Sequence, residues 1–375
     1  MHVAILHNLD HDLLEDDPGR EARKDVAKVA EALASELDQG TMRAQVLPVS
    51  GAAELLATLE RTRPDLVINL CESLAADSRG EMAVPLLLEL LRLPYTGSPA
   101  LALGLALHKH KAKEVLLARG LSTPRFALAE RLEDLAGLEL PFPLIVKPSR
   151  EDASVGVDFD SVVGTRAQLE RAVRAVLNRF RQPALVEQYV DGPEVYVPLL
   201  GNRGGGARTG LPLTEIRFGP AFSGRPRILS YRAKWEAGSA ECKDSPAVPC
   251  TLGSREQERL RALATAAFDA LECQDYGRVD LRLASDGSAY VIDVNPNCDL
   301  HPEAGFARAA AAAGITYRAL AVRLVEIALE RSYGNTPARR AGPAVARRAA
   351  VANRNLLAGR GHLRAGAHRS RASAE

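Results

Sequence analysis

The sequence has little of what marks a membrane-bound, secreted or disulfide-stabilised protein. No apolar run approaches the roughly 20 residues that a helix needs to cross a bilayer, so no membrane span is expected. The N-terminus, MHVAILHNLDHDLLEDD, has no basic stretch and soon turns acidic, which argues against a signal peptide. Free thiols in a reducing cytoplasm are expected, because the cysteines are odd in number and show neither a Cys-x-x-Cys pair nor a zinc spacing. They are Cys71, Cys242, Cys250, Cys273 and Cys298.

Two common phosphate-binding signatures are missing or incomplete. No Gly-x-Gly-x-x-Gly follows the first strand-like run, HVAILHN, so a dinucleotide site has little support. The glycine-rich segment GNRGGGARTG lacks the Lys-Ser/Thr ending of a P-loop and lies between two strand-like runs. We interpret it as an exposed hairpin loop.

Positive charge is concentrated at one end of the chain. The formal net charge is only +1, yet nine arginines and a single glutamate follow Ser332. The body is therefore acidic and lacks the positive excess of a nucleic-acid-binding protein. Residues 333–375 form a basic Ala/Arg-rich tail with little apolar periodicity, which we predict to be disordered. A solvated extension without a partner is favoured, and contact of the tail with RNA or an anionic membrane is the alternative.

The 375 residues are too many for one ordinary core, and their apolar patterns predict two or three packed domains. The first alternates strand-like and helix-like runs, HVAILHN, residues 21–38, RAQVLPV, AELLATLERT and PDLVINL, which indicates a parallel sheet with helices on its faces. A helix over residues 101–119, ended by Gly120, comes next. The strand-like runs PFPLIVKPS and PALVEQYV and a helix over 165–180 follow.

A polar pattern interrupts the strand-like run YVIDVNPN. The segment before it, GRVDLRLASDGSA, contains Asp286–Gly287, which predicts a two-residue hairpin turn. With that turn, Asp280 faces Asp293 and Arg278 faces Asn295 across two antiparallel strands. Carboxylates directly opposed in this way repel each other unless a cation lies between them.

The alternation of side chains along a strand places Asp280, Asp293 and Asn295 on one face and Ile292 and Val294 on the apolar face. All three candidate ligands are hard oxygen donors, without histidine or cysteine, and this set suits Mg²⁺. The pattern therefore predicts a magnesium site that also holds nucleotide phosphates. A surface hairpin with incidental charges is the alternative.

Several charged residues elsewhere fit a phosphate site. Lys147 ends the apolar strand PLIVK and enters a small, polar loop, where its ammonium is well placed to meet a phosphate. Lys109 and Lys113 lie four residues apart on one helix face, and Glu187 and Glu194 follow apolar runs. Each alone is most often a solvated surface charge, so the prediction of a phosphate site depends on their order along the chain.

That order resembles the ATP-grasp superfamily, and specifically the D-alanine–D-alanine ligase-like enzymes. The resemblance extends from about Tyr95 to Leu329 and is weaker before it. It is carried, in sequence order, by YTGS, LHKHKAKEVLLARGLSTP, PFPLIVKPSREDASVGV, LVEQYVDGPEV, YRAKW, YGRVDLRL and YVIDVNPN. It implies three α/β domains: an N-terminal parallel-sheet domain (1–98), a central ATP-grasp subdomain (99–190) and a C-terminal subdomain with the metal site (191–332). ATP would lie between the last two.

The resemblance also implies the residues of an ATP site. They are Lys109 and Lys147 at the phosphates, Ser154 in a mobile loop (152–156) that closes over them, Glu187, Gln188 and Val190 at the adenine, and Glu194 at the ribose hydroxyls.

The implied reaction is carboxylate–amine ligation through an acyl phosphate, with water excluded from the closed site. Lys234 would lie near the γ-phosphate, and Arg278 would stabilise the acyl phosphate and the tetrahedral intermediate. Asp280, Asp293 and Asn295 would hold two Mg²⁺ ions, with Mn²⁺ as an alternative. The partners implied are small amino-acid-like substrates, and a homodimer is left open.

Three segments depart from the family pattern. The loop read as Glu-Gly-Ser-Ser in the family is EDAS here, so Ala153 replaces a serine, and Trp235 replaces a tyrosine. After the metal ligands the family has Asn-x-x-Pro-Gly, whereas this chain places Asp299 at the glycine. A carboxylate there repels a second carboxylate and favours an amine or other cation.

We therefore expect a ligase with altered amino-acid substrates. A true D-alanine–D-alanine ligase of cell-wall synthesis is the first alternative. A non-catalytic nucleotide-binding protein with a partner-recruiting basic tail is the second.

Overall fold

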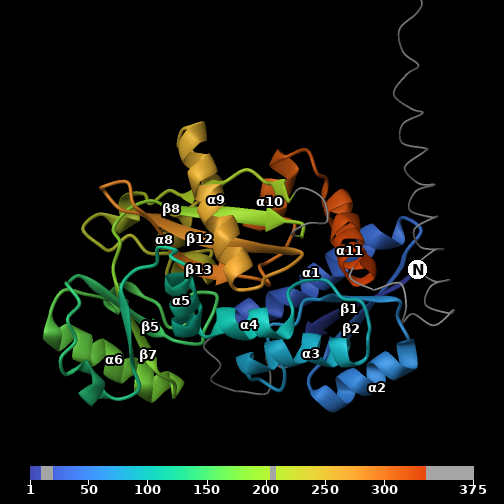
Figure 1. Ribbon diagram of the computed structural model, residues 1–375, viewed down its shortest axis with the longest axis horizontal. Coiled ribbons are helices and arrows are strands. Elements are labelled where there is room, and N and C mark those ends of the chain that lie inside the picture. Colours follow the sequence, from blue (N-terminus) through green and yellow to red (C-terminus); the bar gives the residue numbers. More distant parts are fainter. Residues whose placement is uncertain (10–19, 203–207, 335–375) are drawn as a thin grey trace, which may run out of the picture.

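Three sheets organise the computed structural model, which describes residues 1–9, 20–202 and 208–334 (Figure 1). The first sheet is parallel, with strand order β2-β1-β3, which confirms the parallel sheet predicted for the N-terminal part. Its strands are β1 (His2–Asn8), β2 (Arg43–Val49) and β3 (Leu66–Asn69), and its helices are α1 (Arg20–Asp38), α2 (Ala52–Thr62) and α3 (Ala83–Leu90), the last preceded by the 3-10 turn η1 (Ser78–Met82).

The second sheet is antiparallel and has the order β4-β7-β5-β6. Helix α6 packs against it through Leu169, Val173 and Val176. The elements of this part are α4 (Ala100–Leu107), α5 (Lys109–Ala118), β4 (Phe126–Ala129), η2 (Leu132–Leu135), β5 (Leu144–Pro148), η3 (Phe159–Ser161), β6 (Val162–Val163), α6 (Arg166–Phe180) and β7 (Ala184–Gln188).

The single helix predicted over 101–119 is wrong, because the chain forms two helices that meet at His108. The backbone of His108 leaves the helical region, with φ −83° and ψ 79°, and its ring is hydrogen-bonded to the carbonyl of Gly104. The backbone N–H of Lys109 then bonds to the carbonyl of Ser149, next to the end of β5. The break therefore fixes Lys109 at the start of α5, against the strand that carries Lys147.

The third sheet has six strands in the order β11-β10-β8-β12-β13, with β9 paired to β8. Helix α9 covers its apolar face through Leu260, Ala264 and Phe268. The elements are β8 (Glu194–Leu200), β9 (Thr209–Gly210), β10 (Thr214–Ile216), η4 (Pro220–Phe222), α7 (Tyr231–Trp235), α8 (Ala240–Lys243), β11 (Ala247–Pro249), α9 (Ser254–Ala270), β12 (Tyr276–Leu283), β13 (Ala289–Asn295), α10 (Gly305–Ala312) and α11 (Tyr317–Gly334).

The last helix returns to the beginning of the chain. Helix α11 packs against α1 and shares one core with the first sheet, as Figure 1 shows beside the N-terminus. At its end, Arg331 donates to Asp275 (3.0 Å) and to the carbonyl of Tyr95 (2.6 Å). Asp275 also accepts from the N–H of Gly97 and from Asn202. This buried polar cluster ties the C-terminal helix, the third sheet and the end of the N-terminal part together.

Two further predictions can be compared with the described residues. All five cysteines are free thiols, as predicted. Within the described part of the chain, no helix combines the length and apolarity that crossing a membrane requires. The tail (residues 335–375) and the middle of the glycine-rich segment (203–207) lie outside the described residues. The proposed domain boundaries stay predictions.

Candidate active site

A cleft of about 450 Å³ is walled by the second sheet on one side and the third sheet on the other. Strands β5 and β7 contribute charged side chains from one wall, and β12 and β13 from the other. Lys113, which the sequence also linked to a phosphate site, does not line the cleft. All twelve residues assigned to the nucleotide, metal and catalytic sites do line it: Lys109, Lys147, Ser154, Glu187, Gln188, Val190, Glu194, Lys234, Arg278, Asp280, Asp293 and Asn295.

The hairpin β12–β13 places the acidic residues as predicted. Asp280 is paired with Asp293, and Arg278 with Asn295, in an antiparallel register. Both carboxylates line the same cleft. The oxygen donors are therefore on one side of the sheet.

The turn of this hairpin is one residue longer than predicted, and a bulge compensates for it. Ala284 pairs with Ser288 around a three-residue loop in which Gly287 has φ +83°. The register then shifts by one between Asp280 and Leu281, where Ile292 is the extra residue of β13. The predicted placement of Ile292 on the apolar face is wrong, since it lines the cleft beside Asp293.

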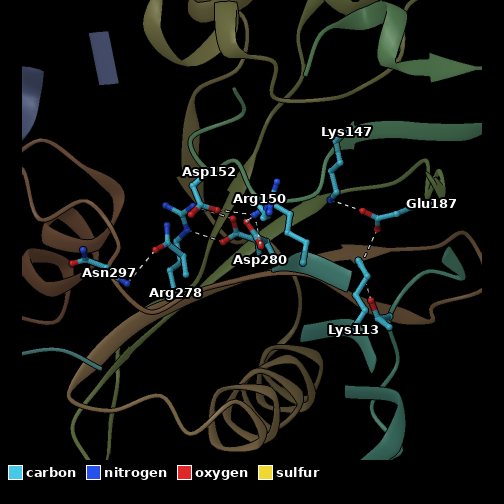
Figure 2. A network of polar contacts seen from close by, with 12 residues as sticks. Lys113, Lys147, Arg150, Asp152, Glu187, Arg278, Asp280 and Asn297 are labelled. Atoms are coloured by element: carbon cyan, nitrogen blue, oxygen red, sulfur yellow. Dashed lines mark hydrogen bonds and ion pairs between the residues drawn. The ribbon is translucent and has the colours of Figure 1, made fainter. Parts of the chain in front are cut away.

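The opposed carboxylates are already compensated by protein cations. Arg278 bonds Asp280 through two nitrogens, at 2.6 and 2.9 Å. The ammonium of Lys109 lies 3.3 Å from Asp293 and 2.7 Å from Asp152 (Figure 2 shows Arg278, Asp280 and Asp152). A lysine and an arginine of the chain therefore supply the positive charge that the opposed carboxylates require.

The electrostatics of the two carboxylates differ. Burial raises the pKa of Asp280, and the charge of Arg278 offsets this only in part. Burial acts on Asp293 in the same direction, but the charges of Lys109 and Lys147 outweigh it and leave the pKa of Asp293 below its ordinary value. The side-chain oxygen of Asn295 accepts from the N–H of Asn297 at 3.2 Å.

The donor set is compatible with Mg²⁺ but does not enclose an ion by itself. Two carboxylates and an amide are the oxygen ligands that Mg²⁺ accepts when water and phosphate complete its shell. Among the described residues, no group of three or more His, Cys, Asp or Glu side chains is arranged to hold a metal ion.

On the opposite wall, Glu187 lies between two lysines. Lys113 is 2.8 Å from one carboxylate oxygen, and Lys147 is 2.5 Å from the other (Figure 2). Burial alone would raise the pKa of Glu187, but the two positive charges outweigh it and lower that pKa. The carboxylate is therefore charged although its side chain is only 2% exposed.

A second buried ion pair, absent from the sequence prediction, involves Glu194. Arg282 donates to Glu194 at 2.6 Å and to the carbonyl of Gly192 at 3.0 Å, and the hydroxyl of Tyr196 donates to Glu194 at 3.0 Å. Arg282 lines the cleft. The sequence contained a signal that could have identified Arg282 as a site residue. Arg282 follows Asp280 by two residues and so shares its face of β12.

The loop over residues 152–156 contacts the part of the chain that contains the third sheet, through backbone carbonyls. The indole of Trp235 donates to the carbonyl of Ala153 at 3.0 Å, and the hydroxyl of Ser154 donates to that of Leu229 at 2.8 Å. Ala153 and Trp235, two positions at which the chain departs from the family pattern, are thus joined by an indole-to-backbone bond. Gly156, with φ +77°, closes the loop where an added Cβ would meet Pro148 at 2.6 Å.

Further acidic and amide side chains line the cleft, and of these the sequence analysis named only Asp299. Asn297 donates to Glu81 at 3.0 Å and to the carbonyl of Cys71 at 3.1 Å, which joins the hairpin end to the N-terminal domain. Burial raises the pKa of Glu81 well above its ordinary value. Glu72 also lines the cleft. Both glutamates come from the segment between β3 and α3, Glu81 from η1, and this segment carried no recognisable motif.

The family can now be assigned. The family model described as "D-ala D-ala ligase C-terminus" matches residues 122–326, more than half of the chain. The chain belongs to the D-alanine–D-alanine ligase family. An uncharacterized protein of Sinorhizobium fredii is 34% identical over 299 residues, which are 78% of this chain and 85% of that protein. A D-alanine–D-alanine ligase of Xanthomonas axonopodis pv. citri is 34% identical over 286 residues, which are 74% of this chain and 83% of that one.

The fold agrees with that assignment. The crystal structure of D-alanine–D-alanine ligase from Bacillus anthracis complexed with ATP matches this chain with a TM-score of 0.71 at 22% identity, covering 90% of this chain and 100% of that one. At this identity the likeness speaks for the fold. It confirms the predicted ATP-grasp architecture, with a parallel N-terminal sheet followed by antiparallel sheets.

Proposed function

We propose that this protein is an ATP-dependent, ADP-forming carboxylate–amine ligase that makes an amide or peptide bond through an acyl phosphate. The main observation in support is that twelve residues named from the family motifs line one cleft. Cations lie on both of its walls, where a triphosphate between the two sheets would meet them.

Each step of the reaction has residues suited to it. An acid substrate's carboxylate attacks the γ-phosphate and ADP leaves; an amine then attacks the acyl carbon, and phosphate leaves with the amide formed. Lys109 and Lys147 are placed to bind phosphates, and Arg278 and Lys234 to stabilise the negative charge that develops on the transferred oxygens. The loop held by Trp235 would exclude water from the acyl phosphate.

Asp280, Asp293 and Asn295 are the residues we propose for metal binding. When bound, Mg²⁺ or Mn²⁺ supplies positive charge to the ATP phosphates. Because Arg278 and Lys109 contact the two aspartates in the present structure, we expect these cations to turn toward the phosphates when metal and nucleotide bind.

We further propose that the amine acceptor differs from D-alanine. Asp299 lies in the cleft and accepts a hydrogen bond only from the backbone N–H of His301 among the described residues. Enclosure by the cleft walls raises the pKa of Asp299, and the charge of Asp25 adds to this. A carboxylate there opposes the carboxylate of an amino-acid acceptor. The alternative is a true D-alanine–D-alanine ligase, which the names of the relatives favour.

Product analysis separates these two functions. The full-length protein is incubated with ATP, Mg²⁺ and a library of D- and L-amino acids and amines, and products are detected by mass spectrometry together with released phosphate. We expect an amide product and phosphate release with an acceptor other than D-alanine. Rapid formation of D-alanyl-D-alanine would establish the alternative. Absence of phosphate release from ATP with every substrate would refute the proposed ligase activity. A cytoplasmic location and small-molecule partners belong to this same proposal.

A further inference from the structure

Lys113 is a buried cation for which the proposed reaction has no direct use. Its side chain is 3% exposed and is not among the residues that line the cleft. It nevertheless contacts Glu187, which does line the cleft, at 2.8 Å. Four residues earlier on the same helix, Lys109 does reach the cleft.

Two ion pairs that share Glu187 connect Lys113 to the cleft. Lys113 pairs with Glu187, and Glu187 pairs with Lys147, so that a carboxylate is shared by one enclosed and one accessible lysine (Figure 2). A buried carboxylate without a counter-charge is strongly unfavourable. If Lys147 turns toward an anionic ligand, only Lys113 keeps Glu187 compensated. Lys113 thus holds Glu187 in place as a partner that Lys147 can leave when it binds a ligand.

Lys113 is itself held from the other wall of the cleft. Its ammonium donates to the hydroxyl of Thr123 at 2.8 Å, and that hydroxyl donates to the carbonyl of Val291 at 2.8 Å. Val291 belongs to β13, two residues before Asp293, whereas Glu187 belongs to β7 of the second sheet. The ammonium therefore connects the nucleotide-facing strands of both sheets.

We propose that Lys113 is a positioning residue for nucleotide binding: it is held by Thr123 and acts through Glu187 to orient Lys147. This inference rests on the proposed function, because it takes the cleft as the ATP site. It differs from the role of a simple stabilising ion pair, whose loss would change the stability of the protein without a specific effect on the nucleotide.

A double-mutant cycle on ATP binding tests it. The dissociation constant for ATP with Mg²⁺ is measured by calorimetry on the full-length protein, its Lys113→Met and Glu187→Gln variants, and the double variant. We expect Lys113→Met to weaken ATP binding by about tenfold or more in the wild-type background and by less than about twofold in the Glu187→Gln background. Lys111→Met is the matched control, because Lys111 is on the same helix but exposed and paired only with Glu114, and it should leave the constant within about twofold.

The outcomes decide between the roles. An unchanged dissociation constant in Lys113→Met, or an equal loss in both backgrounds, overturns the positioning role. If Lys113→Met does not fold, the double variant, in which both buried charges are gone, is compared with Glu187→Gln alone, and weaker ATP binding in the double variant overturns the inference. Wild-type protein that binds no ATP refutes the proposed function as well, whereas ATP binding that is indifferent to Lys113 refutes this inference alone.

Discussion

At the scale of single residues, Lys234 differs from the other cations of the cleft. Lys109 and Lys147 each have a carboxylate partner, as do Arg278 and Arg282. The ammonium of Lys234 has no hydrogen-bond or ion-pair partner among the described residues, although it lines the cleft. Burial and the nearby charge of Arg278 lower the pKa of Lys234. It is therefore a cation available to a ligand, and its pKa lies below that of an ordinary lysine.

This predicts that ATP affinity falls at alkaline pH. A lowered pKa means that the ammonium loses its proton at a lower pH than an ordinary lysine does, and with it the attraction to phosphate. We expect the dissociation constant for ATP to rise by about tenfold between pH 7 and pH 10, as measured by calorimetry. Lys109 stays charged over this range, because Asp152 and Asp293 raise its pKa.

Two variants control for other titrations. Lys234→Met should bind ATP more weakly at pH 7 and show little further loss up to pH 10. Lys234→Arg should keep both its affinity and its charge. The same alkaline loss in all three proteins would assign the effect to another group.

At the scale of secondary-structure elements, the hairpin β12–β13 shows how much of the local structure could be predicted from the sequence. The pairing of Asp280 with Asp293 was predicted from a two-residue turn, and the observed turn has three residues. The bulge at Ile292 restores the predicted register at the site. An Asp-Gly pair suits both turn lengths, and a bulge has no signature in the alternation of apolar residues. The right pairing thus depended on two deviations that cancel.

The break between α4 and α5 was missed for a related reason. The run from Leu101 to Arg119 has a helical composition without proline or glycine at the break. What interrupts it is the hydrogen bond from Lys109 N–H to Ser149 in a distant strand, a tertiary contact. By contrast, the strand-like runs that contain Lys147, Glu187 and Glu194 were predicted correctly, because a short apolar run carries its own signal.

Packing between elements gives a stability prediction at Gly192, just before β8. An added Cβ would lie 1.7 Å from the carbonyl oxygen of Leu283, the last residue of β12. Backbone atoms there cannot yield without moving a strand, so Gly192→Ala should lower the unfolding free energy by about 1–3 kcal/mol. Gly238→Ala, where nothing lies within 4 Å of the added atom, should change it by no more than about 0.5 kcal/mol. Urea unfolding compares the two, and equal stabilities would show that the strand accommodates the methyl group.

At the scale of the whole molecule, the final helix connects the two ends of the described chain. The contacts of α11 with α1 and with the first sheet were beyond sequence reasoning, because an apolar helix face does not identify its partner. The ion pair between Arg331 and Asp275 is the polar part of this junction, with side chains 13% and 0% exposed.

Breaking this pair should destabilise the protein strongly. Arg331→Met leaves the buried carboxylate of Asp275 without its counter-charge, so we expect the unfolding free energy to fall by about 3–5 kcal/mol. Arg323→Met, on the same helix, removes more exposed pairs with Glu326 and Glu330 and should cost no more than about 1 kcal/mol. Thermal and urea unfolding measure both. A similar small loss in the two variants would mean that apolar packing alone holds the helix.

The bond between Trp235 and the carbonyl of Ala153 has a practical consequence. Trp235 is the single tryptophan among the 375 residues, so nearly all fluorescence excited at the long-wavelength edge of the protein's absorption comes from the side chain that holds the loop over residues 152–156. Opening of that loop would hydrate the indole and move its emission to longer wavelength, whereas docking would move it back. Stopped-flow mixing with nucleotide would therefore test, without a dye, the prediction that this loop moves.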